Sequence, residues 1–423
     1  MKRSRSFSTG LMAVAIVAFA LLGATTRVTA QTETVLYSFG STGDGSNPYG
    51  SLAFDAAGNL YGATLYGGAY GSRSNYSGGT VFELTPSSGG SWTETLLHSF
   101  SNGPDGEIPE GGVILDASGN LYGTAVYGGA HGQGTVFEMR PAAGGGWTFA
   151  TLHSFNNNGN DGLNPGAGLV FDAIGNLYST TVLGGSSNNG TVFELTRGTS
   201  GGWAEKTLHS FAHNGQDGFE PSEGNLTRDA AGNLYGAVYG GGLYGSGVVF
   251  ELIRSSGGRW TEKLLHAFGH GSDGVFPQSS LAIDASGNLY GTTQNGGTYQ
   301  EGTVFELSPK PDGGWAYKII YNFVYNGLGG FQPESGLILD SVGNMYGVTQ
   351  DGGNYGYGTV YKLSPNADGS WSETALHSFN FTSGGGDGWS PHGNLVFDSL
   401  GNLYGTTYFG GAHGEGIVFE VTP

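Results

Sequence analysis

Hydrophobic and polar positions alternate along the chain in short runs that are separated by glycine-rich turns. After residue 50 the hydrophobic runs cover 52–55, 60–65, 80–84 and 92–100. They are rich in β-branched and aromatic side chains and end at residues that favour turns, a pattern typical of β-strands. We therefore predict four strands in this segment, the first ending in a tight turn at 56–59.

The four-strand pattern recurs seven times along the chain. Its marker, Gly-Asn-Leu-Tyr with Met345 replacing Leu in the sixth copy, starts at Gly58, Gly119, Gly175, Gly232, Gly287, Gly343 and Gly401. Successive copies are 61, 56, 57, 55, 56 and 58 residues apart. Four strands in a repeat of this length are typical of a propeller blade, because solenoid repeats are usually shorter. The sequence thus predicts an all-β, seven-bladed propeller with four antiparallel strands in each blade, 28 strands in total.

The two ends of this repeat array complement each other. Residues 33–39 match the fourth strand of a unit (97–100), whereas 417–421 match a third strand. The last unit therefore lacks a fourth strand, and we expect the N-terminal strand 33–39 to complete it. Such pairing closes the ring and removes its exposed edges. We expect one domain over residues 31–423.

Composition supports a folded β-protein and excludes some partners. The chain of 423 residues holds 83 Gly and 14 Pro, but 37% hydrophobic and 13% aromatic residues provide a core. There is no Cys, so no disulfide stabilises the fold. The formal charge of −19 argues against binding to nucleic acid or to an anionic membrane.

The N-terminus has the features of a secretory signal peptide. Lys2, Arg3 and Arg5 precede an apolar run over 11–22, and small residues lead to Ala30. This run is too short to span a membrane, and its flanks fit cleavage after Ala30. No second hydrophobic stretch follows. We expect a signal peptide over 1–30 and a secreted protein, extracellular or periplasmic, without an integral membrane segment and monomeric.

Two motifs resemble those of a known family. Gly79-Thr80-Val81-Phe82-Glu83-Leu84 and Leu97-His98-Ser99-Phe100, with their copies, are similar to the Gloeo-Verruco (GloVer) tandem repeat over essentially all of 33–423. The turn 55–61 also resembles hairpins of NHL-type propellers. The resemblance implies an exported bacterial protein, often with a C-terminal anchor, and implies no activity. We expect this chain to lack such an anchor.

Residues that recur in every copy are interpreted as structural. An Asp precedes each Gly-Asn turn and is expected to cap it: Asp55, Asp116, Asp172, Asp229, Asp284, Asp340 and Asp398. The fourth strands carry a Trp and a His that we assign to packing. The Trp residues are Trp92, Trp147, Trp203, Trp260, Trp315 and Trp371. The His residues are His98, His153, His209, His266 and His377, with Tyr37 and Tyr321 in the other two copies.

A further repeated segment, Asp-Gly-x-x-Pro, follows the fourth strand. It starts at Asp44, Asp105, Asp161, Asp217, Asp273 and Asp387, and Gly329 interrupts the series. We interpret it as a turn, braced by Pro, that passes from one blade to the next. The loops at Asp161 and Asp217 resemble calcium loops weakly, but they lack the several carboxylates of such sites. We expect no cofactor, with Ca²⁺ in some of these loops as the alternative.

Function is expected where equivalent positions differ. The position three residues before each first strand lies near the channel mouth and holds Tyr49, Glu110, Gly166, Glu223, Gln278, Glu334 and His392. Carboxylates and an imidazole around one opening would coordinate a cation or act as acid and base. The alternative is solvated loop residues without a shared role.

Aromatic side chains form a second candidate site on the same face. The loops between the second and third strands, together with the extra Trp, provide Tyr70, His131, Tyr244, Tyr299, Tyr355, His413 and Trp389. With Gln278 they are candidates for stacking against sugars, or they pack on neighbouring glycines. Arg228 replaces a hydrophobic residue of the first strand, so we expect a carboxylate partner, Glu223 or Glu251.

No nucleophile elbow, P-loop, HExxH or Cys/His metal motif occurs in the chain. The leading hypothesis is an exported, non-catalytic binding propeller that recognises a glycan or another exported protein. The alternative is a carbohydrate-active lyase or hydrolase that uses Glu110, Glu223 or Glu334 with His392 and Tyr49. A third hypothesis is a structural component of the cell surface or matrix.

Overall fold

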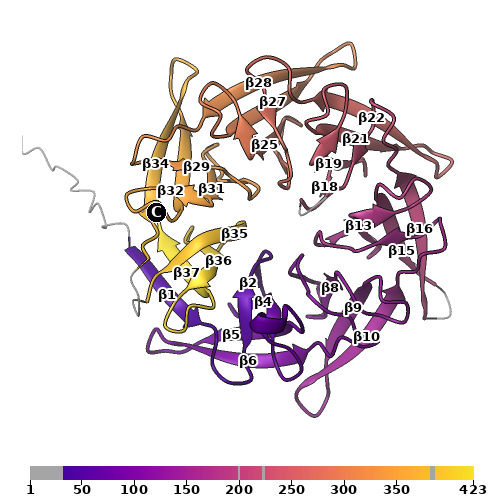
Figure 1. The fold of residues 1–423 in the computed structure, drawn as a ribbon, viewed down its shortest axis with the longest axis vertical. Helices are drawn as coiled ribbons and strands as arrows, with labels where there is room; N and C mark the ends of the chain where they lie inside the picture. The colour runs from indigo at the N-terminus through magenta and orange to yellow at the C-terminus, as the bar shows by residue number, and fades with distance from the viewer. Residues whose placement is uncertain (1–31, 199–200, 222–223, 382–385) are drawn as a thin grey trace, which may run out of the picture. The chain divides into compact units, whose positions relative to one another are not determined.

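The structure is a computed structural model that describes residues 32–423 except 199–200, 222–223 and 382–385. The expected signal peptide over 1–30 lies outside the described residues. Residues 31–423 form one compact unit. In this unit, seven four-stranded antiparallel sheets succeed one another around a ring, and the chain colour runs once around it (Figure 1). The prediction of a seven-bladed all-β propeller is confirmed.

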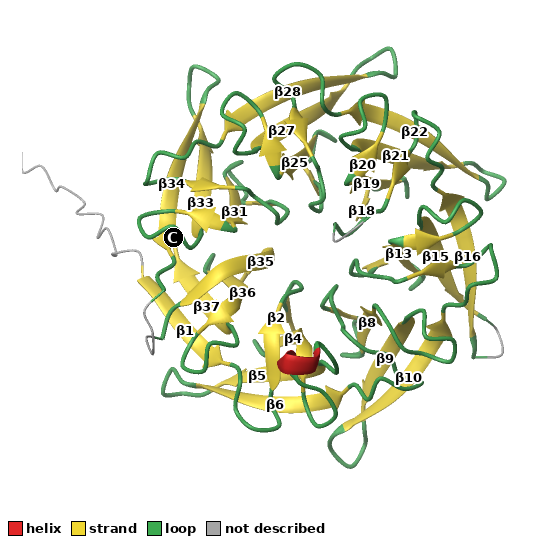
Figure 2. Ribbon diagram, viewed as in Figure 1, coloured by secondary structure: helices red, strands yellow, loops and turns green. Residues whose placement is uncertain are grey.

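Each blade has its first strand nearest the centre and its fourth strand at the outer rim (Figure 2). Blade 1 consists of β3 (Ala53–Phe54), β4 (Leu60–Gly67), β5 (Thr80–Pro86) and β6 (Trp92–Ser99). Blade 2 consists of β7 (Val113–Leu115), β8 (Leu121–Ala125), β9 (Thr135–Pro141) and β10 (Trp147–Ser154). Blade 3 consists of β12 (Val170–Phe171), β13 (Leu177–Thr181), β15 (Thr191–Arg197) and β16 (Trp203–Ser210).

The remaining blades repeat this order. Blade 4 consists of β18 (Thr227–Arg228), β19 (Leu234–Val238), β21 (Val248–Arg254) and β22 (Trp260–Ala267). Blade 5 consists of β24 (Ala282–Ile283), β25 (Leu289–Thr293), β27 (Thr303–Pro309) and β28 (Trp315–Asn322). Blade 6 consists of β30 (Ile338–Leu339), β31 (Met345–Thr349), β33 (Thr359–Pro365) and β34 (Trp371–Ser378). Blade 7 consists of β35 (Gly388–Phe397), β36 (Leu403–Gly410), β37 (Ile417–Thr422) and β1 (Thr32–Ser38).

Blade 7 is completed by the N-terminal strand. β1 pairs with β37 in antiparallel register, with Glu33 opposite Val421 and Ser38 opposite Ile417. The indigo start of the chain therefore lies beside its yellow end (Figure 1). The predicted closure of the ring by residues 33–39 is confirmed.

Short ladders extend the first and second strands toward the face that carries the loops between the fourth and first strands, called here the loop face. The extra strands in blades 1, 3, 4, 5 and 6 are β2 (Gly45–Pro48), β11 (Gly162–Leu163), β14 (Leu183–Gly184), β17 (Gly218–Phe219), β20 (Gly240–Gly241), β23 (Gly274–Val275), β26 (Asn295–Gly296), β29 (Gly330–Phe331) and β32 (Asp351–Gly352). In blade 7 the extension belongs to β35 and β36 themselves, where Trp389 pairs with Phe409. One 3₁₀ turn, η1 (Arg73–Asn75), lies in the loop between β4 and β5.

The Asp before each Gly-Asn turn caps that turn, as the sequence predicts. In blade 1, Oδ1 of Asp55 accepts hydrogen bonds from the backbone N–H groups of Ala57 (2.8 Å) and Asn59 (2.9 Å). Its Oδ2 accepts from Nδ2 of Asn59 and from the hydroxyl of Tyr61. Gly58 has φ +88° in this turn, a conformation that glycine adopts without strain. The repeated Asp is therefore a structural residue.

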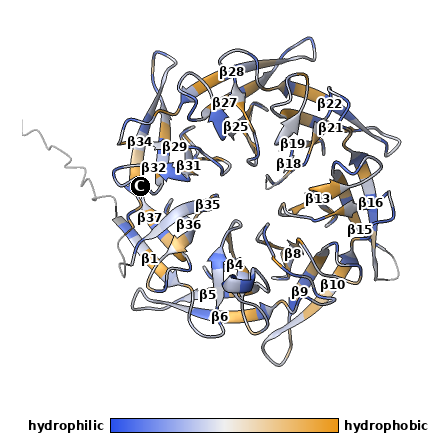
Figure 3. Cartoon of the chain, viewed as in Figure 1, coloured by the Kyte–Doolittle hydropathy of each residue, from blue (hydrophilic) through white to orange (hydrophobic). Residues whose placement is uncertain are grey.

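The hydrophobic core is divided into clusters that lie between neighbouring blades. One cluster joins Tyr122 and Phe155 of blade 2 to Leu177 and Phe193 of blade 3. The strands carry both hydrophobic and hydrophilic residues (Figure 3). A fully buried Phe follows the fourth strand of every blade: Phe39, Phe100, Phe155, Phe211, Phe268, Phe323 and Phe379. No blade can bury its hydrophobic residues alone, so the ring is the folding unit.

The Asp-Gly-x-x-Pro segments link successive blades on the loop face. A Cβ atom on Gly134 of blade 2 would lie 2.5 Å from Cδ of Pro165, so only glycine lets Pro165 pack there. The residue before this Pro, Asn164, has φ +58° and donates its backbone N–H to the carbonyl of Gln133 in blade 2 (2.9 Å). The predicted role of this segment, a turn braced by Pro between blades, is confirmed.

At the outer rim, the Asp of this segment binds the fourth-strand ring. Nε2 of His98 lies 3.1 Å from Oδ2 of Asp105, and Nε2 of His266 lies 2.8 Å from Oδ2 of Asp273. The hydroxyl of Tyr37 donates to Oδ2 of Asp44 in the same way. Because each ring faces the fourth strand of the next blade, we call these contacts the rim joints.

A third residue, from the fourth strand of the next blade, completes each rim joint. At two joints it is aromatic: Phe149 stacks on His98 with ring centroids 4.2 Å apart, and Tyr317 stacks on His266 at 3.8 Å. At the other five joints it is a glutamate: Glu33, Glu94, Glu205, Glu262 and Glu373.

The joint at Gly329, where the Asp is missing, shows how this third residue compensates. The hydroxyl of Tyr321 donates to Oε2 of Glu373 (2.7 Å), and the N–H of Gly330 donates to its Oε1 (3.3 Å). A Cβ atom on Gly329 would lie 2.8 Å from Oε2 of Glu373. The carboxylate of the next blade therefore occupies the place of the missing Asp side chain.

Removal of the Phe39 side chain tests the closure of the ring. Phe39 is as fully buried as Phe211, its counterpart inside the array. We expect Phe39→Ala and Phe211→Ala each to lower the free energy of unfolding by about 3–5 kcal/mol, the range for loss of a buried Phe. Denaturant unfolding measures both values. A loss below about 1 kcal/mol for Phe39→Ala alone would show that β1 does not belong to the core.

Glu94 is expected to make stability depend on pH. Burial, and after it the charge of Asp44, raise the pKa of Glu94 from 4.5 to about 7. The folded protein then binds a proton between pH 4.5 and 7 that the unfolded chain does not bind, so this contribution to stability is lost as pH rises through that window. The free energy of unfolding of the wild type should therefore fall relative to Glu94→Gln between pH 4.5 and 7. The exposed Asp312→Asn is the control, and an unchanged difference between wild type and Glu94→Gln would contradict the assignment.

Candidate functional site

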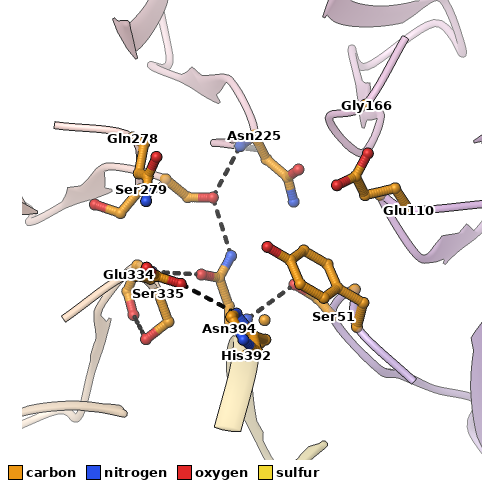
Figure 4. A pocket seen from close by; sticks show the side chains of 16 residues that line it. Ser51, Glu110, Gly166, Asn225, Gln278, Ser279, Glu334, Ser335, His392 and Asn394 are labelled. Carbon is orange, nitrogen blue, oxygen red and sulfur yellow. Dashed lines mark hydrogen bonds and ion pairs between the residues drawn. The ribbon is translucent and has the colours of Figure 1, made fainter. Parts of the chain in front are cut away.

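The variable residues before the first strands meet at the centre of the propeller. Six of the seven predicted residues line one pocket (Figure 4): Tyr49, Glu110, Gly166, Gln278, Glu334 and His392. The seventh, Glu223, lies outside the described residues. The loops from the described blades thus converge on one opening, and we call this space the channel pocket.

Blades 6, 7 and 1 hold the titratable cluster of the channel pocket. Nδ1 of His392 lies 3.3 Å from Oε2 of Glu334, and Tyr49 stacks on the His392 ring with centroids 4.5 Å apart. Nε2 of Gln294 donates to Oε1 of Glu334 at 2.5 Å. Burial lowers the pKa of His392 to about 4, so its imidazole is neutral near pH 7. Glu110 lies on a different side of the pocket from Glu334 (Figure 4).

An amide network that the sequence analysis missed lies beside these residues. Nδ2 of Asn394 donates to Oγ of Ser280 (3.0 Å), which also accepts the backbone N–H of Asn225 (2.9 Å). Asn394 of blade 7 thereby reaches blade 5, which is not its neighbour. The signal in the sequence is weak, because the same position is Gly in other copies, such as Gly112 and Gly336.

The size of the channel pocket limits its contents. Its volume is about 40 Å³. A water molecule needs about 10–15 Å³ on this measure, so the space holds a few water molecules or a small ion. Ligand sites for organic molecules usually measure about 300–1,000 Å³. A sugar ring does not fit between these side chains as they stand.

A larger cleft lies on the loop face where blade 7 meets the β4–β5 loop of blade 1. Its volume is about 500 Å³. It is lined by Arg73, Phe381, Asp387, Trp389, Phe409 and His413, together with the backbone of residues 410–414. Two of these, Trp389 and His413, are residues that the sequence analysis selected for ligand binding.

The side chains of this cleft, called here the blade 7/1 cleft, form an aromatic surface with one cation. Trp389 and Phe409 are stacked with ring centroids 4.1 Å apart, and Phe381, which is 52% exposed, stands nearly perpendicular to Trp389. The guanidinium of Arg73 lies 4.9 Å from the Phe409 ring centroid and forms an ion pair with Glu415 (3.1 Å). This ion pair connects the loop of blade 1 to blade 7.

One long loop and the segment before β35 contribute to the blade 7/1 cleft. The loop between β4 and β5 of blade 1 is longer than its counterparts and holds η1 with Arg73, and Phe381 lies between β34 and β35, next to residues 382–385, which are outside the described residues. Arg73, Phe381, Asp387 and Phe409 were not selected from the sequence as ligand-binding residues. The spacing of the Gly-Asn-Leu-Tyr marker could have pointed to Arg73 and Phe381, because these residues lie in the two longest intervals of the array, 61 and 58 residues.

The other aromatic residues of the loop face stay apart from both pockets. Tyr70, Tyr244, Tyr299 and Tyr355 are exposed, as is His131. None of them lines the channel pocket or the blade 7/1 cleft. Gln278 lines the channel pocket, and none of these rings belongs to the lining of that pocket. The rings therefore do not form the single platform that the sequence analysis considered.

Arg228 has a different environment from the one expected. Among the described residues no carboxylate forms an ion pair with it, and the proposed partner Glu251 contacts Tyr235 and Lys263 instead. The other proposed partner, Glu223, lies outside the described residues. The Arg228 side chain lies over Gly232 in its own turn and is only half-buried, so it does not need a buried ion pair.

Within the described part of the chain, no helical segment has the length and hydrophobicity that crossing a membrane requires.

Solved structures with a similar arrangement have little sequence identity to the chain. A protein assigned as an oxidoreductase (glucose dehydrogenase) from Thermus thermophilus has a TM-score of 0.43 and 15% identity, over 76% of this chain and 94% of its own. A luciferin-regenerating enzyme has a TM-score of 0.43 and 14% identity, over 76% and 92%. A protein of unknown function from Dyadobacter fermentans has a TM-score of 0.45 and 13% identity, over 93% and 99%.

No protein with a curated description matches the sequence. The family model that describes the Gloeobacter/Verrucomicrobia repeat matches residues 21–170, 145–338 and 310–423. These three segments overlap and include all seven blades. The chain therefore belongs to the Gloeobacter/Verrucomicrobia repeat family.

Proposed function

We propose that this protein is an exported, non-catalytic binding protein that recognises a glycan in the blade 7/1 cleft. The observation that carries the proposal is that Arg73, from the long β4–β5 loop of blade 1, and the aromatic residues Trp389 and Phe409 of blade 7 line one cleft of about 500 Å³. Export rests on the N-terminal signal sequence.

The chemistry of the cleft suits a sugar. Aromatic rings offer flat apolar surfaces for the C–H faces of a pyranose, and the surrounding Arg73, Asp387 and His413 offer donors and acceptors for its hydroxyl groups. Arg73 is held in place by Glu415 before any ligand binds, which reduces the entropy lost on binding. A volume of this size accommodates one or two sugar rings.

The proposal assigns no catalysis to the channel pocket. A glycosidase needs two carboxyl groups on either side of a bound sugar. Glu110 and Glu334 face a space that holds only a few water molecules, and His392 with its pKa near 4 is a weak base. The carboxylates and the imidazole are better explained as polar residues around an ordered water cluster or a small cation.

Substitutions in the cleft test the proposal. The position of Trp389 is Phe in blades 4 and 6, so Trp389→Phe should fold normally. We expect Trp389→Phe to weaken glycan binding about tenfold through lost stacking area, and Arg73→Ala to weaken it about ten- to a hundredfold through a lost charged hydrogen bond. A glycan array identifies the ligand, and calorimetry measures the affinities.

Two controls separate binding from folding. Tyr299→Ala removes an exposed ring from an equivalent loop outside the cleft and should leave the affinity unchanged. Glu415→Gln breaks the ion pair of Arg73 but keeps its guanidinium, so its affinity should stay above that of Arg73→Ala. Equal affinities for all four variants, or binding only to an exported protein partner, would overturn the proposal of a glycan site here.

A further inference from the structure

Three of the seven rim joints combine an imidazole with two carboxylates. Each contains a fourth-strand His, the Asp of the following Asp-Gly-x-x-Pro segment and a Glu from the fourth strand of the next blade. The three sets, which we call the rim triads, are His153–Asp161–Glu205, His209–Asp217–Glu262 and His377–Asp387–Glu33. In each triad, one ligand atom from every residue lies within 4.8 Å of the other two.

The spacing within a rim triad fits a metal ion. Nε2 of His209 lies 3.4 Å from Oδ2 of Asp217 and 3.7 Å from Oε2 of Glu262. Nε2 of His153 lies 3.2 Å from Oδ2 of Asp161. Zn²⁺ binds nitrogen and carboxylate oxygen at about 2.0–2.2 Å, so ligand atoms around a tetrahedral ion lie about 3.3–3.6 Å apart. Small movements of the side chains would bring all three atoms to bonding distance.

Two carboxylate oxygens of the triads, Oε1 of Glu262 and Oε1 of Glu33, are buried without a hydrogen bond, and Nε2 of His209 has only its two longer contacts with Asp217 and Glu262. The side chains of Asp161 and Asp217 are only 5% and 8% exposed. A second buried carboxylate beside each His–Asp pair is costly to ionise, and a cation would reduce that cost.

Two of the four rim joints without a triad show that the fold does not need the glutamate. Phe149 and Tyr317 occupy its position at two joints, where they stack on His98 and His266. The His–Asp pair is retained at these joints. A stacked ring therefore satisfies the packing at lower electrostatic cost, so the glutamates at the triads need another explanation.

We propose that each rim triad binds one divalent transition-metal ion of the Zn²⁺ class, which connects the fourth strands of two neighbouring blades. One imidazole and two carboxylates suit zinc, with a water molecule as the fourth ligand. Calcium prefers six to eight oxygen ligands, so the nitrogen ligand argues against it. At the third triad the ion connects β34 to the N-terminal strand β1 and so stabilises the closure of the ring.

Access of solvent supports this proposal at the first triad. His153, Asp161 and Glu205 line a surface pocket of about 490 Å³ together with Asn156, Asn158 and Asn160. An ion can therefore reach this triad without unfolding of the blade, and the amide side chains can hydrogen-bond to its bound water.

Titration of the metal-free protein with ZnCl₂ tests the proposal. We expect calorimetry to show three equivalents of Zn²⁺ and the midpoint of thermal unfolding to rise as Zn²⁺ is added. Glu205→Phe, Glu262→Phe and Glu33→Phe copy the aromatic joint that the fold already uses, so they should fold. Each should remove one equivalent. The reverse substitution Phe149→Glu completes a fourth triad at His98 and Asp105 and should add one.

Controls distinguish the triads from adventitious binding to surface histidines. His131→Ala and His270→Ala remove exposed imidazoles outside the triads and should leave three equivalents. Circular dichroism verifies that every variant is folded. No saturable binding at 1 mM Zn²⁺, or a stoichiometry that is unchanged by the Glu→Phe substitutions, would overturn the proposal. The Zn²⁺ stoichiometry is measured without a glycan, and the triads of His153 and His209 share no residue with the blade 7/1 cleft, so their result is independent of the proposed function.

Discussion

Burial of hydrophobic residues between neighbouring blades is the interaction on which the whole structure depends. Each core cluster takes side chains from two blades, as Phe155 of blade 2 and Phe193 of blade 3 illustrate. A blade at the end of an open array would expose half of its core. The pairing of β1 with β37 removes this problem, since it brings Phe39 into a cluster with Phe82 of blade 1. Without Cys, noncovalent contacts keep the ring closed.

Closure of the ring also determines where variation can become functional. The strands, the Asp-capped turns and the Pro–Gly contacts are used in every blade, so they have the same role seven times. The long β4–β5 loop (68–79) differs from its counterparts, and the ring places its Arg73 beside Trp389 and Phe409 of blade 7, although these residues lie near opposite ends of the sequence. The blade 7/1 cleft exists because the closed ring makes the first and last blades neighbours. Its aromatic and cationic side chains are the basis of the proposed glycan site.

The sequence predicted the scaffold well because the scaffold is repeated. Seven copies of one turn establish the period, and the unmatched strands at the two ends imply closure. The residues around the channel were predicted for the same reason, since a fixed offset from the first strand puts Glu334 and His392 on one ring of positions. Contacts that depend on the neighbouring blade were harder to predict. Neither the cleft position of Arg73 nor the approach of Glu262 to His209 follows from spacing within one repeat.

The joint at Gly329 has a consequence for how such a chain diverges. Its missing carboxylate is replaced by Glu373, which comes from a different repeat copy. The two sides of a joint are therefore matched to each other rather than to a common consensus. Copies can drift independently along most of their length, but their facing edges must change in pairs. The two members of such a pair lie on the fourth strands of successive blades, so a chimaera that exchanges single blades would separate them, whereas one that exchanges several consecutive blades would keep the pairs inside the exchanged segment together.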